Sequence, residues 1–300
     1  MKTLKREIVI GIVIALATLS AVWFFFKKME KEKTVMQTDL YTFIPSSPQA
    51  VLSINRPPLF SKTLLKDTAV YTAFASKLPE VFLSIIRNTS QNVPMLFSFH
   101  PSGIVLYTPA DPDRMKQMEE MIFKNLFGSF SPQIQKNGEI SFIYYPDVEN
   151  RFFGYYTYKG IWVASYSKKL LEKVAQLQKN AIYPIFSLPK TVRESFDRNA
   201  PANLMFKSNP LNVYVVTDSL ASAEWRMPDS WLGADLFGSE GNACVFGSLP
   251  FEGNDSLCFA LADTLSRRIE QLFPSLDLTH QVIKEKDRIF YTGCNEKKNR

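Results

Sequence analysis

The sequence opens with an uncharged apolar run of nineteen residues, from Ile8 to Phe26, before a longer stretch of mixed polar and apolar positions. A helix of this length crosses the hydrocarbon core of a bilayer. Basic residues flank the run on both sides, so the positive-inside count is nearly balanced and does not set the orientation. We expect a short basic amino terminus at residues 1–7, a transmembrane signal-anchor at residues 8–26, and a polar juxtamembrane linker at residues 27–39.

Two alternatives to the anchor stay open. Ala15-Leu16-Ala17 resembles the small-x-small cleavage site of a secretory signal peptide, although the apolar run continues past it to Phe26. A buried core helix is the other alternative, but soluble helices of this length seldom lack a polar residue stronger than Ser or Thr. The uncleaved anchor accounts for the whole run, and it makes the lipid bilayer the partner of residues 8–26.

From residue 40 onward, short strand-like runs alternate with helices that carry an apolar stripe. The expected fold class is α+β: an N-terminal transmembrane helix, then a mainly antiparallel sheet domain with packed helices, which we divide into halves at residues 40–180 and 181–300. In the first half the pattern predicts strands at 50–55, 95–99 and 104–108, three strands within 140–166, and helices capped by Asp67, Asp111 and Ser167.

The stretch from Ile140 to Tyr166 is unusually aromatic, with ten Phe, Tyr or Trp residues among 27. Aromatic residues on both faces of a strand indicate either a sheet that is covered on both sides or a face held open for a ligand. We favour coverage on both sides, because Tyr and Trp pack well in half-buried sheets.

The second half repeats the order of elements found in the first, which predicts an internal duplication. Asn199 to Phe206 resembles Ser46 to Ser53, and a hairpin at 234–249, a helix at 257–273 and closing strands at 281–284 and 288–292 follow. The alternative is a single α+β domain with accidental local similarity.

Charge and cysteine content narrow the class of partner. The formal net charge is +6, but residues 1–33 hold seven Lys or Arg against three Glu, and the other 267 residues hold 28 against 26. A domain with such balanced charge lacks the excess of basic residues that nucleic-acid binding requires. The basic residues within 1–33 suit contact with lipid headgroups beside the anchor. The three cysteines, Cys244, Cys258 and Cys294, allow at most one internal disulfide, so they leave the redox compartment open.

Three segments carry a family resemblance: Ile44-Pro45 with Ala50 to Asn55, Gly160 to Glu172, and Leu272-Phe273-Pro274. On these residues the chain resembles uncharacterised membrane-anchored exported proteins of Gram-negative bacteria, built as a domain of unknown function behind one anchor. The resemblance implies an exported, tethered α+β domain, and it brings no activity, cofactor or catalytic residue.

The search for reactive motifs finds little. Ser-x-x-Lys, the pattern of penicillin-binding hydrolases, occurs as Ser165 with Lys168 and as Ser187 with Lys190, but its partner elements are missing. Only two histidines exist, His100 and His280, so a His-rich metal site is excluded and a His-containing triad is unsupported. We assign no catalytic, cofactor-binding or metal residue, no cofactor, and no specific ligand residue.

Two function classes remain. The first is a membrane-tethered extracytoplasmic module that binds or scaffolds an envelope protein or polymer, in the inner membrane with its C-terminal domain in the periplasm. The second is an envelope hydrolase whose Ser or carboxylate chemistry is not visible in the sequence. Convergent Ser, Lys or carboxylate groups in one cleft would favour the hydrolase, and a shallow aromatic face would favour the binding module.

Overall fold

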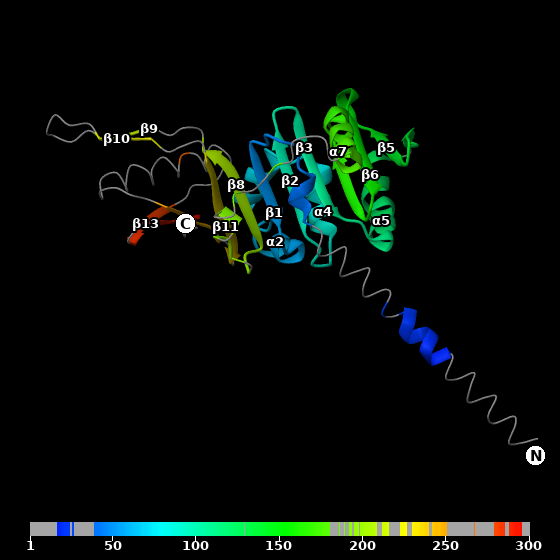
Figure 1. The fold of residues 1–300 in the computed structure, drawn as a ribbon, viewed down its shortest axis with the longest axis horizontal. Helices are drawn as coiled ribbons and strands as arrows, with labels where there is room; N and C mark the ends of the chain where they lie inside the picture. The colour runs from blue at the N-terminus through cyan, green and yellow to red at the C-terminus, as the bar shows by residue number, and fades with distance from the viewer. Residues whose placement is uncertain are drawn as a thin grey trace, which may run out of the picture. The chain divides into compact units, whose positions relative to one another are not determined.

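The computed structural model describes residues 17–24, 26, 39–128, 130–180, 186, 189, 192–193, 195–197, 199–208, 212–215, 223–226, 230–239, 242–250, 267, 279–285 and 288–295. The chain divides into two compact units, residues 1–39 and 40–300. Figure 1 shows the second unit as one broad sheet flanked by helices.

In the first unit, residues 17–24 and 26 are helical, and the side chains of Leu19, Trp23 and Phe24 are exposed. Residues 8–16 and 25 of the expected anchor lie outside the described part of the chain. Within the part that is described, no helix has the length and apolar character needed to cross a membrane.

Twelve strands of the second unit form one antiparallel sheet, in the order β13-β14-β12-β11-β8-β1-β2-β3-β7-β6-β5-β4, and β9 pairs with β10 as a separate hairpin. The α+β class and the mainly antiparallel sheet are therefore confirmed. The strands are β1 (Ala50–Ile54), β2 (Met95–His100), β3 (Gly103–Pro109), β4 (Gln133–Asn137), β5 (Ile140–Pro146), β6 (Phe152–Tyr158), β7 (Ile161–Ser165), β8 (Ala202–Ser208), β9 (Asn212–Val215), β10 (Ala223–Arg226), β11 (Ser230–Ser239), β12 (Asn242–Pro250), β13 (Thr279–Glu285) and β14 (Arg288–Asn295).

The described helical segments of the second unit that have assigned bounds lie in its first half, and α3 and α5 start at the capping residues expected from the sequence. The helix expected at 257–273 lies, apart from residue 267, outside the described residues. Asp67 accepts hydrogen bonds from the main-chain N–H groups of Ala69 and Val70, at 2.9 and 3.1 Å, and Asp111 accepts one from Arg114 at 3.0 Å. The segments are η1 (Leu40–Phe43), α2 (Pro57–Thr63), α3 (Thr68–Ala75), α4 (Glu80–Asn88), α5 (Pro112–Met118), η2 (Glu119–Phe123), α6 (Lys124–Phe127), η3 (Val148–Asn150) and α7 (Lys168–Asn180).

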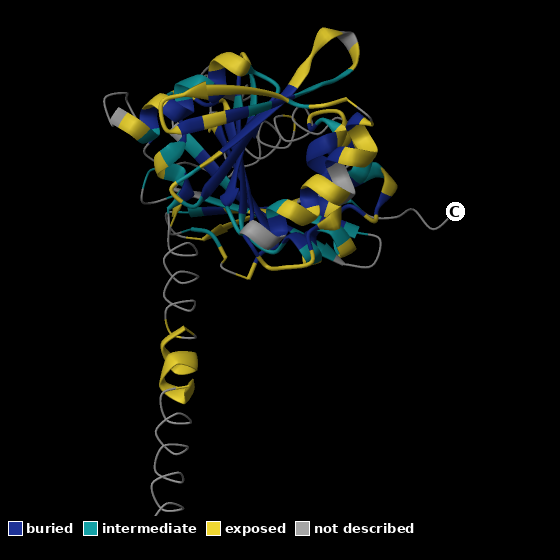
Figure 2. Ribbon diagram, turned by 90° about the vertical axis from the view of Figure 1, so that its right-hand side faces the viewer, coloured by how far each residue is buried: buried dark blue, intermediate teal, exposed yellow. Residues whose placement is uncertain are grey.

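Each strand sends alternate side chains to opposite faces of the sheet, and each face has its own core. On one side, which we call the α4 face, Leu52 packs with residues of α2 to α6 such as Phe82. On the other side, the α7 face, Val51 belongs to a core that includes Leu171 and Val174 of α7. Figure 2 shows this burial in dark blue along the central strands, with exposed yellow residues on the outer helices.

The aromatic strands β5 to β7 are covered on both sides, as the sequence predicts. Phe153 and Trp162 are buried on the α4 face, where both contact Phe123 of η2 with ring centroids 5.4 and 6.4 Å apart. Phe142 and Tyr156 are buried on the α7 face, with centroids 5.2 Å apart. At β6 and β7 both faces of the sheet are therefore covered by helices, whereas the edge strand β4 is exposed.

The helix that starts at Asp111 differs from the expected regular one. Residues Glu119–Phe123 form a π turn, after which α6 ends before Gly128. A π turn adds one residue to the turn and rotates all later positions around the helix axis. Leu126, expected in the buried stripe, is therefore 39% exposed, and Phe123 and Phe127 point into the core instead.

The two halves meet at the centre of the sheet, where β1 pairs with β8 and Leu52 lies opposite Leu204. Outward from this pair, the first half continues through β2, β3, β7 and β6, and the second half through β11, β12, β14 and β13. In each half the first strand is followed by a hairpin, and the last two strands then add in reverse chain order. As far as β6 on one side and β13 on the other, the strand order is therefore the same, and β5 and β4 then extend the first half.

The residue alignment of the two halves expected from the sequence is wrong by one position. It matches Ala50 with Asn203, yet Ala50 and Leu52 face the same core as Ala202 and Leu204. Because side chains alternate with a period of two, a shift of one residue exchanges the two faces. The alignment in which matched residues lie on the same face of the sheet therefore matches Leu52 with Leu204.

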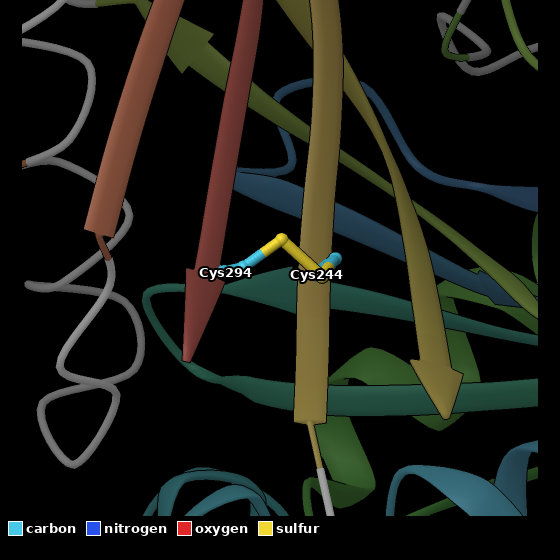
Figure 3. The surroundings of a disulfide bond; sticks show 2 residues. All are labelled: Cys244 and Cys294. Carbon is cyan, nitrogen blue, oxygen red and sulfur yellow. A yellow bond between two sulfur atoms is a disulfide. The ribbon is translucent and has the colours of Figure 1, made fainter. Parts of the chain in front are cut away.

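A disulfide joins β12 to β14. Cys244 and Cys294 lie directly opposite each other in the antiparallel register, with Cα atoms 4.1 Å apart (Figure 3). Sequence counting allowed one internal disulfide without saying which cysteines form it. Such bonds persist in oxidising compartments, so this one favours an extracytoplasmic location for the domain.

We predict that removing this bond destabilises the second half. In the chain-entropy description, a disulfide closing a 50-residue separation is worth about 4 kcal/mol. The double variant Cys244→Ala, Cys294→Ala should lose roughly that free energy of unfolding in urea titrations. Non-reducing tryptic mass spectrometry of the wild-type chain should recover the two cysteine peptides linked, and recovery of both as free thiols would contradict the pairing.

Candidate ligand groove

An open groove of about 270 Å³ lies on the α7 face of the second half. Its floor is formed by β11, β12 and β14, and one wall comes from the turn that precedes β8. The lining residues are Ser195, Phe196, Gly233, Ala234, Asp235, Phe246, Gly247, Ser248, Phe290, Tyr291 and Thr292.

The wall can stand close to the floor because β11 has a glycine at the contact. A Cβ atom at Gly233 would lie 2.6 Å from Cε1 of Phe196 and 2.9 Å from Cγ1 of Val192. Both distances are shorter than a carbon contact allows. Gly233 therefore seats the turn of Val192 and Phe196 against the sheet and sets the width of the groove.

A strip of exposed large apolar side chains begins in the groove with Phe246 and Phe290 and continues beyond it to Ile283. Phe246 on β12 is 39% exposed, Phe290 on β14 is 38% exposed, and Ile283 on the edge strand β13 is 56% exposed. Ile283 lies directly opposite Phe290, and Phe246 contacts Phe237 of β11 edge to face at 5.4 Å. Large apolar side chains gathered on one face mark a binding surface more often than chance exposure does.

The groove's carboxylate, Asp235, is fully occupied by its neighbours. Its Oδ1 accepts a hydrogen bond from Asn203 Nδ2 at 2.6 Å, and its Oδ2 accepts one from the main-chain N–H of Asp197 at 3.0 Å. Asn55, the residue after β1, donates to Asn203 Oδ1 at 2.6 Å, so the network runs from the end of β1 through β8 to β11. Asp235 therefore holds strands together rather than offering a base to a ligand.

The hydroxyl groups of the groove do not form a reactive pair either. Ser248 Oγ accepts a hydrogen bond at 2.9 Å from Arg288 Nη2, on the paired strand β14. No Lys or His is among the residues that line the groove. A nucleophile needs a base within hydrogen-bond reach, and the lining residues supply none. The groove has the character of a shallow aromatic binding face.

The first Ser-x-x-Lys pair forms the start of α7 rather than a nucleophile and its base. Ser165 is buried, its hydroxyl donates to the carbonyl of Ile104 at 2.7 Å, and it accepts from the N–H of Ser167 at 2.9 Å. Lys168 instead places its ammonium 3.9 Å from Glu172. Ser167, the expected cap, accepts from the N–H of Leu170 at 3.4 Å.

The other candidates from the sequence are not assembled into a site among the described residues. Ser187 and Lys190 lie outside them, and so does Cys258. His280 lies in β13, far along the chain from His100, which ends β2.

His100 is part of a buried chain of polar groups. Its Nε2 lies 3.0 Å from Ser98 Oγ, which lies 3.2 Å from the hydroxyl of Tyr107. Burial, with a smaller contribution from the positive charge of Lys173, lowers the pKa of His100 to about 4. Ser98 and Tyr107 are completely buried, so no substrate reaches them and the chain serves to satisfy polar groups inside the core.

Comparison with protein-family models, with curated proteins and with solved structures finds no match for this chain. The groove therefore has to be understood from its own contacts. Sequence reasoning placed β11, β12, β13 and β14 but did not single out Phe246, Phe290 or Ile283. The repeated order of elements could have identified them, if the two halves had been aligned so that matched residues lie on the same face of the sheet.

We predict a pH effect from Asp235. Burial raises the pKa of its carboxyl above the ordinary value, and the charge of Asp197 adds to this, against the hydrogen bonds from the Asp197 N–H and Asn203. The folded protein thus binds the proton more tightly than the unfolded chain. This stabilisation is complete below the ordinary carboxyl pKa and is lost as pH rises through the raised value.

Urea unfolding between pH 3.5 and 7 tests this effect. Asp235→Asn should remove this part of the pH dependence, and it should cost on the order of 1 kcal/mol at low pH because its amide replaces one acceptor with a donor. Glu285→Gln, on the exposed end of β13, is the matched control. Parallel pH profiles for the wild type and Asp235→Asn would show that the carboxyl is not perturbed.

Proposed function

We propose that this protein is a membrane-tethered, extracytoplasmic binding module whose second half takes up an amphipathic helix of an envelope partner protein. The observation that carries the proposal is the exposed strip of Phe246, Phe290 and Ile283. In the first half of the sheet, the equivalent positions are covered by the helix α7.

The correspondence follows from the strand registers. Starting from Leu52 and Leu204 at the centre, the residue paired with each one on the next strand outward can be followed to the edge. This gives one row of neighbouring residues in each half, and both rows face the α4 side. The first row is Leu52, Phe97, Leu106, Ala164 and Tyr155, and the second is Leu204, Ala234, Gly247, Tyr291 and Val282.

The neighbours of these rows on the α7 face differ sharply in burial. Val105, Val163 and Tyr156 of the first half are completely buried, in the core that α7 completes with Leu171 and Val174. Their counterparts, one residue from the second row, are Phe246, Phe290 and Ile283, which are 39%, 38% and 56% exposed. The same three positions are thus covered by a helix in the first half and exposed to solvent in the second.

The wall of the groove has a counterpart too. In the first half, the short helix η1 precedes β1, and its Leu40 and the following Ile44 are buried in the α7 core. In the second half, a helical turn precedes β8, and Val192 and Phe196 pack against the same core with the same spacing of four. α7 packs beside η1, so a helix in the groove would rest against Val192 and Phe196 in the same way.

An internal duplication accounts for these matches together. Strand order, hairpin positions, the preceding turn and the faces of the rows all repeat, although the side chains have diverged. A duplicated half that keeps the surface on which α7 lies in the first half, with its large apolar side chains exposed, offers an apolar site of fixed shape. The chemistry of that site fits an amphipathic helix whose apolar stripe meets two Phe rings and one Ile.

The location rests on separate observations. The apolar run at residues 8–26 suits a single-pass anchor in the inner membrane, and the disulfide of Cys244 and Cys294 suits an oxidising periplasm. The resemblance to anchored exported proteins of Gram-negative bacteria agrees with this placement. A periplasmic domain with a membrane tether has envelope proteins as its available partners.

The binding face can be tested by photo-crosslinking in membranes. A benzoylphenylalanine at position 283 or 290 should crosslink to one partner segment whose contacts recur every three or four residues. Covering each apolar side chain is worth about 1 kcal/mol, so Phe246→Ala should weaken capture about five-fold. Urea unfolding should show that this exposed substitution leaves the fold intact.

The matched control places the same crosslinker at Ile134, which is 64% exposed on the opposite edge strand β4. Equal crosslinking at both places would contradict a specific face. Crosslinks from position 283 that map to another copy of this chain, or to an extended segment along β13, would replace the helix by a dimer or by strand addition.

The tether has its own test. The full-length chain should stay with membranes through alkaline carbonate extraction, because the run at 8–26 has no charge. Protease added to spheroplasts should digest the domain and spare an amino-terminal tag. A protected domain would reverse the orientation, and release by carbonate would remove the anchor.

A further inference from the structure

Arg114 lies in the first turn of α5 and is only 6% exposed, although it is a charged residue. A buried arginine normally has an acceptor for each of its nitrogen atoms, because leaving a charged donor without one is costly. The contacts of Arg114 satisfy only part of this requirement.

One end of the guanidinium is well held. Nη2 donates to Thr108 Oγ1 at 3.0 Å and also contacts the carbonyl oxygen of Pro109, at the end of β3. Nε and Nη1 are both buried and have no hydrogen-bond partner in the described part of the chain. These two nitrogen atoms carry three N–H groups between them.

The same side chain lines a small cavity between the end of α4 and the start of α5. The cavity volume is about 20 Å³, and the other lining residues are Asn88, Thr89, Ser90, Gln91, Gln117 and Met118. A water molecule needs roughly 10–15 Å³, so the space suits one water-sized or chloride-sized group and cannot enclose a phosphate.

The charge balance of the cavity favours an anion over water. None of the lining residues is acidic. Burial lowers the pKa of Arg114 to about 10, against the opposing effect of Asp111, so the guanidinium stays charged at neutral pH. Asp111 is engaged by the main-chain N–H of Arg114 at 3.0 Å, as the cap of α5.

We propose that this cavity is a binding site for a small monovalent anion, held by Nε and Nη1 of Arg114. The ligand is either a free chloride or the tip of a carboxylate, since both present a compact negative charge. Binding ties the end of α4 to the start of α5 and stabilises the folded state in proportion to the anion concentration. The site lies in the first half and is independent of the groove and its partner.

Thermal unfolding of the full chain in detergent tests the proposal. Sodium chloride and sodium formate, each compared with sodium gluconate at equal ionic strength, should raise Tm saturably by roughly 2–4 °C. Arg114→Met should abolish the rise. Arg87→Met, which alters an arginine on α4 that pairs with Glu80 at the surface, is the matched control and should retain it.

A second measurement needs no variant. Chloride-35 resonances should broaden in the presence of the wild-type chain, and formate should reverse the broadening. A response to formate alone would assign the site to carboxylates. Equal Tm in all three salts, no broadening, or a chloride effect that survives in Arg114→Met would show that the cavity holds only water.

Discussion

The pairing of β1 with β8 is the contact on which the rest of the domain depends. It joins the two halves into one sheet, and its register decides which side chains face which core. Leu52 and Leu204 lie opposite each other on the α4 face, and the polar chain of Asn55, Asn203 and Asp235 crosses the same strands on the other face. A slip of one residue would turn Leu204 away from the core that holds Leu52 and would separate Asn203 from Asn55 and Asp235, so both faces select the same register.

This central pair also explains why the two halves share a pattern but differ in what they present. A two-fold rotation axis perpendicular to the sheet relates the halves without exchanging the two faces. Corresponding residues therefore lie on the same face of the sheet. Among the described residues, what lies over that face differs between the halves: α7 covers Val105, Val163 and Tyr156 in the first half, and their counterparts in the second are exposed. Of the polar groups nearby, Asp235 and Ser248 are engaged in hydrogen bonds with neighbouring strands. The domain thus combines a half whose α7 face is covered by its own helix with a half in which the corresponding side chains are exposed.

Local signals predicted much of the first half correctly. Asp67 and Asp111 cap helices because their carboxylates reach N–H groups two or three residues away. The strand β4 was missed, since Gln133 to Asn137 are all exposed at a sheet edge and carry almost no apolar pattern. The π turn at Glu119 was missed because one extra residue in a turn leaves the composition of the stripe unchanged. Ser165 and Lys168 matched the spacing of a nucleophilic serine and its lysine base. Spacing along the chain does not specify the directions in which the two side chains point.

The sequence by itself determined the class of the fold, the strands of the first half other than β4, the caps of two helices there, and the approximate positions of β8, β11, β12, β13 and β14. These are properties of neighbouring residues, and short-range hydrogen bonds and hydrophobic periodicity encode them. Only the tertiary structure decided that Cys244 pairs with Cys294, that Asp235 is occupied, and that Phe246, Phe290 and Ile283 are left uncovered. Each of these outcomes depends on strand pairing between residues far apart in the chain. Whether a side chain is core or surface depends on the layer placed over it, which its own segment does not specify.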